Sequence, residues 1–286
     1  MDFTKLQGVG NDFVLVETDD TSRDWAYLSQ SFCDRRFGIG ADGLVLLMAS
    51  NKADFRMRIF NSDGSEAEAC GNGLRCLIRY ILERGLADAS AEELVIETMA
   101  GVRKARIKRT ENGLPVIQVG LGSPVFKAED IPVNLDDGSG EEVDIKYPLS
   151  RIITVNNCEL MLHFVSMGNP HAIYFTEQPV VAFPLAQMGH EVEHHRMFPQ
   201  RTNFEVVRVL GQGRIEARVW ERGVGETLAC GSGAAAIAVA ARLLGYTGDS
   251  VDIKLPGGIL HVDWAGQGEV LLSGPAEIVF TGQWPE

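Results

Sequence analysis

The chain has 286 residues, of which 45% are hydrophobic and 23% charged, and its formal net charge is −13 at pH 7. Its length fits two domains of about 140 residues, and its acidity argues against general nucleic-acid binding, which needs a basic surface. No window holds the ~18 uncharged apolar residues of a membrane span, and no secretory signal opens the sequence. We therefore expect a cytoplasmic globular protein.

Alternation of apolar and polar residues predicts short strands in the first half of the chain. In chain order these are 14–17, 44–48, 55–59, 94–98, 102–109 and 116–119. A helix is expected after the third strand, because Leu74, Leu77, Ile78, Ile81 and Leu82 share one helical face and Gly85 follows as a stop. The acidic, glycine-rich segment 134–144 predicts a surface turn or hairpin tip.

The second half predicts a similar series of elements. Strands are expected at 152–155, 162–166, 172–175, 204–209, 215–219, 252–255, 259–264, 270–273 and 277–280. After the fifth of these strands, the segment AAAIAVAARLL (234–244) is apolar nearly all round and predicts a helix buried on most sides, ending at Gly245.

The two halves carry an internal repeat. RIFNSDGSEAEACGNG (58–73) aligns with RVWERGVGETLACGSG (218–233) at a constant offset of 160, so that Cys70 and its two glycines match Cys230 and its two glycines. VGNDF (9–13) resembles MGNPH (167–171) at an offset of 158. We infer a duplication: an α/β chain of mixed α+β type with two pseudo-symmetric domains, each a curved mixed sheet around a central helix. The expected domains are 1–122 plus 275–286, and 123–274.

The five cysteines divide into two groups. An odd number in an unsecreted chain does not indicate a disulfide framework, so we expect Cys33, Cys76 and Cys158 to be buried apolar side chains. Cys70 and Cys230 each precede a predicted helix within Cys-Gly-x-Gly, where backbone N–H groups and the helix dipole favour a thiolate and can bind a carboxylate.

A single such motif would more often serve packing than catalysis, but two copies point to one reaction. Inverting a carbon that carries an acidic hydrogen needs a base on one face and an acid on the other. Two thiols facing each other across an interdomain cleft meet that need, and the helix N-termini would stabilise the charge that develops on the substrate carboxylate.

At these residues the sequence resembles the diaminopimelate epimerases over nearly its whole length. The segments that carry the resemblance are GNDF (10–13), FGIGADG (37–43), FNSDGSEAEACGNGLRC (60–76), SMGNPH (166–171), RTNFEVV (201–207) and ERGVGETLACGSG (221–233). Proline racemases are less similar, because their first motif typically has His where Asn72 stands. The isomerases of phenazine biosynthesis lack the thiol pair.

The resemblance implies a role for each matching residue. Cys70 and Cys230 would be the acid/base pair, and His171 and Glu221 would adjust the thiol pKa values. The substrate-binding residues implied are Asn11, Asn61, Gly71, Asn72, Asn169, Asn203, Glu221, Arg222, Gly231 and Ser232. The family implies no pyridoxal phosphate and no metal, a homodimer, and a place in lysine and cell-wall synthesis. The small amino-acid substrate would be its binding partner.

The residue types agree with a substrate that has an amino acid at each end. Asn side chains offer a donor and an acceptor, Arg222 could pair with a distal carboxylate, and Glu221 could meet its ammonium. Taken alone, each Asn would more often be a turn or cap residue, His171 a structural histidine, and Glu221 with Arg222 a solvated pair.

One departure from the family and two rival functions stay open. Some members carry Gln where this chain has Gly43, which leaves a substrate contact missing or replaced by water. The nearer rival is a racemase of the same fold for another amino acid, such as histidine or glutamate. The remoter one is a thiol redox or metal protein, although the spacing of Cys70 and Cys76 fits neither a Cys-x-x-Cys pair nor usual zinc ligands.

Overall fold

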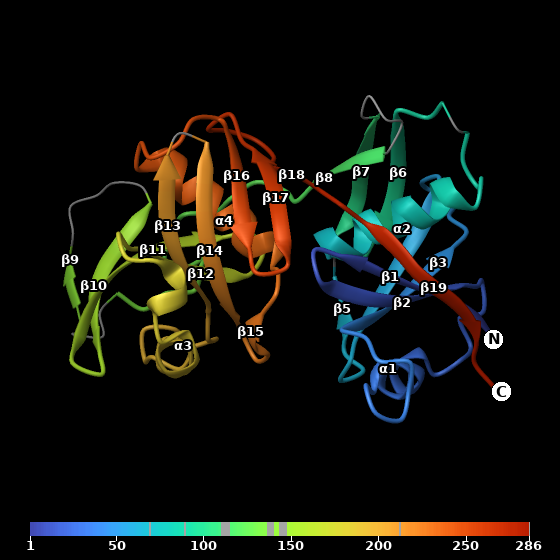
Figure 1. Cartoon of the computed structure of the whole chain (residues 1–286), viewed down its shortest axis with the longest axis horizontal. Coiled ribbons are helices and arrows are strands. Elements are labelled where there is room, and N and C mark those ends of the chain that lie inside the picture. Colours follow the sequence, from blue (N-terminus) through green and yellow to red (C-terminus); the bar gives the residue numbers. More distant parts are fainter. Residues whose placement is uncertain are drawn as a thin grey trace. The chain divides into compact units, whose positions relative to one another are not determined.

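A computed structural model describes residues 1–68, 70–88, 90–109, 115–135, 140–142, 148–211 and 213–285. The chain divides into two compact units (Figure 1). Unit 1 is Met1–Gly120 with Ser273–Glu286, and unit 2 is Leu121–Leu272. No helix in the described part of the chain is long and apolar enough to cross a membrane.

Unit 1 is a mixed sheet with two helices. Its strands are β1 (Asp2–Gly8), β2 (Asn11–Glu17), β3 (Gly43–Met48), β4 (Phe55–Asn61), β5 (Glu66–Ala67), β6 (Glu93–Thr98), β7 (Gly101–Arg109), β8 (Pro115–Gly120) and β19 (Glu277–Gln283). The spatial order is β19–β1–β2–β3–β4–β6–β7–β8, with β5 paired to β4. Strands β2 and β3 run parallel, as do β4 and β6, and the other pairs are antiparallel.

The helices of unit 1 cover the sheet. Helix α2 (Gly71–Glu83) contacts β1, β2, β3, β4, β8 and β19, so the sheet curves around it. Helix α1 (Trp25–Cys33) packs Trp25 and Phe32 against Leu44 and Leu46. Every residue of β3 is buried, as expected for a strand covered on both faces.

Unit 2 repeats this plan. Its strands are β9 (Gly140–Glu142), β10 (Leu149–Val155), β11 (Cys158–Ser166), β12 (Pro170–Phe175), β13 (Asn203–Gly211), β14 (Arg214–Glu221), β15 (Gly225–Thr227), β16 (Ser250–Leu255) and β17 (Gly258–Asp263); β18 (Leu271–Gly274) spans the unit boundary. The order is β9–β10–β11–β12–β13–β14–β16–β17, and β12/β13 and β14/β16 are the parallel pairs. A 3₁₀ turn, η1 (Val180–Ala182), precedes helix α3 (Leu185–Glu193).

The helices confirm the duplication and the mixed fold class. Helix α1 follows β2 and helix α3 follows β12 and η1, and α2 and α4 (Gly231–Leu243) both follow the cysteine, each pair at an offset of 160. Helix α4 is buried along its length and contacts β11, β12, β13, β16 and β17. Gly85 and Gly245, the predicted stops, have φ of 65° and 78°, as expected for the residue after a helix.

The sequence patterns located all the strands expected above, and missed several elements. Strand β1 was missed because its alternation is broken by the buried polar residues Thr4 and Lys5. Helices α1 and α3 are short and carry mixed polar residues, so neither gives a clear periodic stripe. The expected turn at 134–144 lies mostly outside the described residues.

The expectation that Cys158 is buried is wrong, whereas Cys33 and Cys76 are buried as expected. Cys158 pairs with Val155 at the tip of the β10–β11 hairpin. Between them Asn156 and Asn157 have φ of 52° and 63°, which Asn tolerates better than other side chains. The thiol at this hairpin tip is exposed.

Candidate active site

Cys70 caps the N-terminus of α2. Its backbone is extended (φ −145°, ψ 117°), and its Sγ accepts a hydrogen bond from the Gly73 N–H at 3.4 Å. The first N–H groups of a helix have no acceptor within the helix, so those of Gly71 and Asn72 lie beside the thiol as anion donors. Unit 1 thus supplies one thiol and one set of backbone donors at the same helix end.

Asn72 and Asn11 are joined next to this thiol. Asn72 donates to Asn11 Oδ1 at 3.1 Å and accepts from Arg75 at 2.7 Å, and Arg75 also donates to the Gly71 carbonyl. Arg75 is completely buried, and burial lowers its pKa from the ordinary value. A buried cation one helical turn from Cys70 makes this helix start electropositive.

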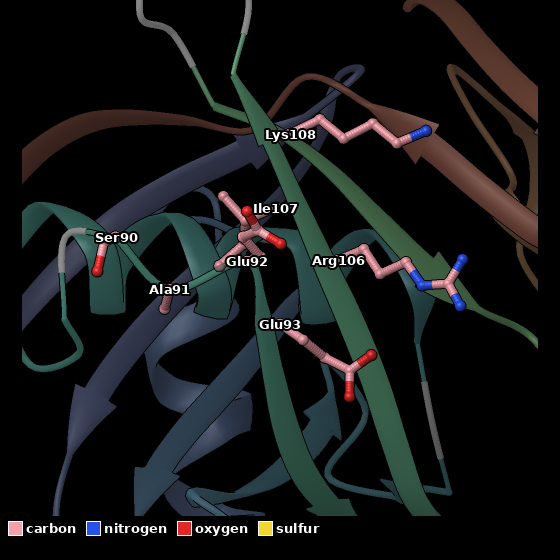
Figure 2. Close-up of a pocket in the computed structure, with 7 residues that line it drawn as sticks. All are labelled: Ser90, Ala91, Glu92, Glu93, Arg106, Ile107 and Lys108. Carbon is pink, nitrogen blue, oxygen red and sulfur yellow. The ribbon is translucent and has the colours of Figure 1, made fainter.

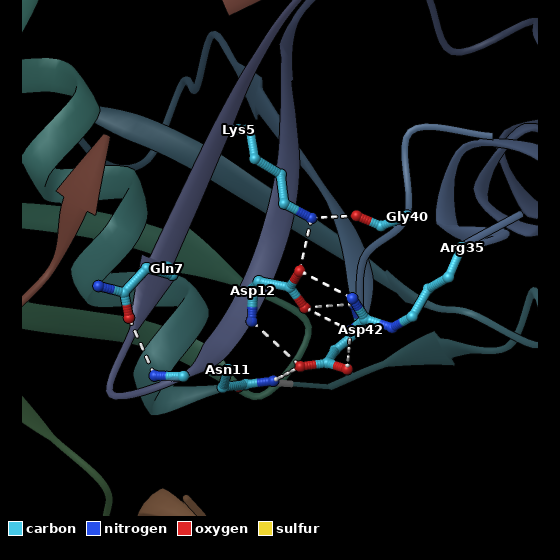
Figure 3. Close-up of polar contacts among 8 residues, drawn as sticks. Lys5, Gln7, Asn11, Asp12, Arg35, Gly40 and Asp42 are labelled. Atoms are coloured by element: carbon cyan, nitrogen blue, oxygen red, sulfur yellow. Dashed lines mark hydrogen bonds and ion pairs between the residues drawn. The ribbon is translucent and has the colours of Figure 1, made fainter. Parts of the chain in front are cut away.

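A network of charged residues holds Asn11 in turn (Figure 3). Asn11 donates to Asp42 at 2.7 Å, Arg35 bridges Asp42 and Asp12, and Lys5 pairs with Asp12 at 2.6 Å and donates to the Gly40 carbonyl. Immediately before Asn11, Val9 and Gly10 form the β1–β2 turn with φ of 58° and 82°. A β-branched residue at positive φ is strained, and such strain gathers where structure serves function.

Asn61 and Gly43 face each other at the ends of paired strands β3 and β4. The Asn61 amide donates to Ser65 Oγ at 2.9 Å, so this residue shapes the loop that leads to Cys70. A Cβ at Gly43 would lie 2.8 Å from the Phe60 carbonyl oxygen. A larger residue at this position, such as Gln, would therefore need a backbone shift.

Cys230 repeats the arrangement of Cys70 in unit 2. It caps α4 with an extended backbone (φ −125°, ψ 115°), and its Sγ accepts from the Gly233 N–H at 3.4 Å. The sulfur also lies 3.5 Å from Ser232 Oγ. The N–H groups of Gly231 and Ser232 form the second set of helix-end donors.

Three predicted residues form a chain that leads to Cys230. Asn169 donates to Ser232 Oγ at 3.3 Å, and its Oδ1 lies 3.0 Å from His171 Nε2. On the other side of the ring, His171 Nδ1 lies 2.7 Å from Glu205 Oε1. The series Glu205–His171–Asn169–Ser232–Cys230 is continuous, and both His171 and Glu205 are completely buried.

Glu221, Arg222 and Asn203 lie at one loop. Asn203 Oδ1 accepts the Arg222 N–H at 2.9 Å, and the Arg222 guanidinium donates to the Gln200 carbonyl at 3.2 Å and is otherwise exposed. Glu221 accepts from Thr227 at 2.5 Å. Glu221 is followed by a turn in which the Gly223 N–H donates a hydrogen bond to the buried Glu193 carboxylate at 2.8 Å.

The surroundings of Cys230 raise the pKa of the thiol and of two carboxyl groups near it, those of Glu221 and Glu205. Burial, followed by the Glu221 carboxylate, raises the pKa of Cys230 well above its ordinary value. Burial also raises the pKa of Glu221 and of Glu205, although the hydrogen bonds to Thr227 and His171 act against it. The hydrogen bonds of the Cys230 sulfur with the Ser232 hydroxyl and the Gly233 N–H lower the pKa of the thiol, as expected for a helix start, but burial outweighs them.

The structure brings the predicted residues together within each unit. Asn11 meets Asn72, and His171, Asn169, Ser232 and Cys230 form one chain. Sequence reasoning missed Glu205, Arg75 and Asp42. A charged residue inside the apolar run FEVV was the available signal for Glu205, and the arginine on the apolar face of α2 was the signal for Arg75.

A surface hollow of about 700 Å³ lies elsewhere on unit 1. It is lined by Ser90, Ala91, Glu92, Glu93, Arg106, Ile107 and Lys108, on β6, β7 and the segment before them (Figure 2). Figure 2 shows the long side chains of Arg106 and Lys108 extending away from the backbone of β7. None of the candidate site residues lines this hollow. Among the described residues, no group of three or more His, Cys, Asp and Glu side chains is placed to hold a metal ion.

Comparison with known proteins identifies the relatives of this chain. It matches the sequence model of the diaminopimelate epimerases over residues 3–127 and 163–279. It is 43% identical over 288 residues to a diaminopimelate epimerase of Carboxydothermus hydrogenoformans, covering 99% of both chains, and 45% identical to one of Moorella thermoacetica, covering 100% and 99%. A predicted epimerase from Pseudomonas aeruginosa shares the fold, with a TM-score of 0.70, 16% identity, and 99% and 98% of the two chains covered.

Proposed function

The chain belongs to the diaminopimelate epimerase family, and we propose that it interconverts LL- and meso-2,6-diaminopimelate by moving a proton between two thiols. The observation that carries the proposal is the repeated placement of cysteine. Cys70 and Cys230 each cap a helix, and each sulfur accepts one backbone N–H at 3.4 Å. No pyridoxal phosphate or metal is required by this chemistry.

Each turnover moves one proton in and one proton out. The thiolate of one cysteine removes the α-hydrogen, the electron pair stays on the α-carbon, and the thiol of the other cysteine delivers its proton to the opposite face. The first sulfur ends as a thiol and the second as a thiolate, so the reverse reaction begins from the exchanged state. The mechanism requires both sulfurs to reach one carbon, one sulfur on each face.

The weak acidity of the α-hydrogen is the main barrier. The substrate α-carboxylate would accept hydrogen bonds from Gly71 and Asn72 at one helix end and from Gly231 and Ser232 at the other. These donors are fixed by the helices before substrate arrives, so they stabilise the charge that develops during proton removal without reorganisation.

We expect the protein to distinguish diaminopimelate from other amino acids by binding its distal amino-acid end. We assign its carboxylate to Arg222, whose exposed guanidinium can form a two-pronged pair, and its polar contacts to Asn11, Asn61, Asn169 and Asn203. Glu221 and His171 would adjust the thiols. In support, burial raises the pKa of Glu221, and the charge of the Glu221 carboxylate disfavours the Cys230 thiolate.

Incubation with LL-diaminopimelate in heavy water tests the function. We expect meso product carrying deuterium at the inverted carbon, under reducing conditions that keep both thiols active. The same panel includes histidine and glutamate, which a racemase of another substrate class would exchange instead. Neither exchange nor meso product from diaminopimelate would refute the substrate assignment.

Alanine variants test the two-base mechanism. Cys70→Ala and Cys230→Ala should each abolish inversion, because each face needs its own proton carrier. The control is Cys158→Ala, which removes an exposed thiol at a hairpin tip and should keep full activity. Near-full activity in either of the first two variants would rule out the mechanism.

A homodimer in the cytoplasm, serving lysine and cell-wall synthesis, is also part of the proposal. In support, β19 pairs with β1 along one edge and exposes Val279 and Phe280. Apolar side chains on a strand at the end of a sheet favour association. Sedimentation of Phe280→Lys should give a lighter species than the parent chain, and an unchanged sedimentation coefficient would exclude this edge as the interface.

A further inference from the structure

Glu205 is the buried charged group that the proposed reaction leaves without a role. It lies near the start of β13, has no exposed surface, and places Oε1 2.7 Å from His171 Nδ1. Its other oxygen, Oε2, has no hydrogen-bond partner among the described residues. Burying a carboxyl group with one partner is costly, which indicates that the group is retained for its effect on His171.

The first turn of α4 is built around this carboxyl group. A Cβ at Gly233 would lie 3.0 Å from Glu205 Oε1 and 3.3 Å from Cys230 Sγ. Gly233 therefore lets the helix start approach both groups, and its N–H is the one that reaches the sulfur. The titratable groups that face Glu205 are His171 on β12, Cys230 at the start of α4 and Glu221 on β14.

The position of the ring hydrogen on His171 follows from Glu205 together with Asn169. If the carboxyl group is ionised, it accepts Nδ1–H, and the ring is then an imidazolium that carries hydrogen on Nε2 as well, because a neutral ring would set an unprotonated Nε2 against the acceptor Asn169 Oδ1. If it is protonated, its O–H donates to Nδ1, and the single ring hydrogen is on Nε2. In both states Nε2–H points at Asn169 Oδ1, 3.0 Å away.

That hydrogen sets the direction of the remaining bonds. With its Oδ1 engaged by His171, Asn169 donates its amide hydrogen to Ser232 Oγ, and the Ser232 hydroxyl is left to donate to the Cys230 sulfur. We propose that Glu205 is a positioning residue that fixes His171 with hydrogen on Nε2 and thereby directs this chain of donors onto Cys230. The inference rests on the proposed two-thiol reaction.

Unit 1 has the same fold but lacks a histidine and a glutamate at the positions that match His171 and Glu205. The offset of the repeat places Phe13 where His171 stands and Val45 where Glu205 stands, and both are buried. The strands pair alike, since Phe13 faces Gly43 and His171 faces Asn203. An apolar pair therefore satisfies the packing, so the acid and the imidazole serve the neighbouring thiol.

Activity is the first test. Glu205→Gln keeps the shape of the side chain, but its amide can either donate to Nδ1 or accept from it, so both His171 tautomers become available. We expect kcat to fall about tenfold or more, as when a histidine loses the carboxylate that fixes its tautomer, and KM to stay within about twofold. The control is Glu216→Gln on neighbouring β14, where Glu216 pairs at the surface with Lys254. Equal kcat in Glu205→Gln and the parent chain would overturn the inference.

Nitrogen-15 spectra of histidine-labelled protein give a readout independent of turnover. The His171 signals are assigned by their loss in His171→Phe, and the parent chain should show a protonated Nε2. In Glu205→Gln a fraction of the population should shift to hydrogen on Nδ1. An identical His171 spectrum in the two proteins would also overturn the inference.

A double-variant cycle separates positioning from packing. In a His171→Phe background, adding Glu205→Val recreates the pair found in unit 1, so the variant is expected to fold. If Glu205 acts through His171, the second change should add no further loss of kcat; losses that multiply would count against it. A parent chain with no epimerase activity would instead refute the proposed function, while the spectra would still test the role of Glu205.

Discussion

The charged network beneath Asn11 makes a quantitative prediction about Asp12. Asp12 accepts hydrogen bonds from Lys5 at 2.6 Å and Arg35 at 2.7 Å, and Lys5 is only 6% exposed (Figure 3). Asp12→Asn keeps the size of the side chain and removes its charge. The change leaves the Lys5 ammonium buried beside a neutral amide, with the Gly40 carbonyl as its remaining acceptor.

The magnitude follows from the pKa of Asp12. Burial acts to raise this pKa, but Arg35 and Lys5 outweigh it and hold the value at about 2, against 3.8. That shift corresponds to about 2.4 kcal/mol, which we reduce to about 1.5 kcal/mol because solvent screens the 58% exposed Arg35. Leaving Lys5 buried without its carboxylate adds further cost, so we expect a loss of about 2 to 3 kcal/mol.

The pH dependence has a definite sign. A carboxyl group with a lowered pKa in the folded state stabilises the protein above the unfolded pKa, and this contribution disappears as pH falls toward the folded value. The stability difference between the parent chain and Asp12→Asn should therefore be complete at neutral pH. It should shrink by about half near pH 3.

Urea unfolding at both pH values, followed by tryptophan fluorescence, measures this difference. Asp249→Asn is the matched control, since Asp249 is 63% exposed and its pairing with Arg242 should contribute about 0.5 kcal/mol or less. A loss in Asp12→Asn no larger than in the control, or a loss independent of pH, would show that the network does not stabilise unit 1.

Three further changes are predicted with their measurements. Gly233→Ala would place a Cβ 3.0 Å from Glu205 Oε1 and crowd the carboxyl group. We expect kcat to fall about tenfold or more with little change in melting temperature. An unchanged kcat would show that this crowding does not disturb the site. Gly189→Ala would place a Cβ 2.6 Å from Trp220 and should cost about 2 kcal/mol in urea unfolding, and a neutral change would show that Trp220 can move aside. Burial lowers the pKa of His163 from 6.5 to about 4, so the unfolded chain binds more protons between these pH values, and the parent chain should lose about 3 kcal/mol of stability as pH falls from about 6.5 to about 4. His163→Gln should remove that part of the pH dependence, and an unchanged profile would refute it.

Much of the fold was predictable because the sequence contains an internal repeat, so each half supports the prediction made for the other. The offset of 160 places both cysteines before helices, and α2 and α4 begin at Gly71 and Gly231 as expected. The apolar run of α4 predicted its burial, because a helix with no polar face needs cover on all sides. Local sequence patterns were sufficient to predict these helices because each pattern agrees with how the helix packs in the fold.

The residues that the patterns missed depend on pairing between distant strands. Glu205 meets His171 only because β12 and β13 lie parallel with α3 inserted between them in the chain, and nothing local in either strand signals that contact. Asp42 reaches Asn11 through the equivalent pairing of β2 and β3. Sequence reading named Asn11 and His171 but could not name the residues that hold them.

The departures from symmetry have a chemical purpose that the repeat alone does not predict. A two-base inversion begins with one thiolate and one thiol, so identical surroundings would favour the same state for both cysteines. Beside Cys70 the helix carries buried Arg75, where the repeat places Ala235; beside Cys230 lie Glu205 and Glu221. The buried surroundings of the two sulfurs therefore differ: a guanidinium lies near Cys70, whereas burial and the Glu221 carboxylate disfavour the thiolate of Cys230, so the duplicated scaffold does not treat its two thiols alike.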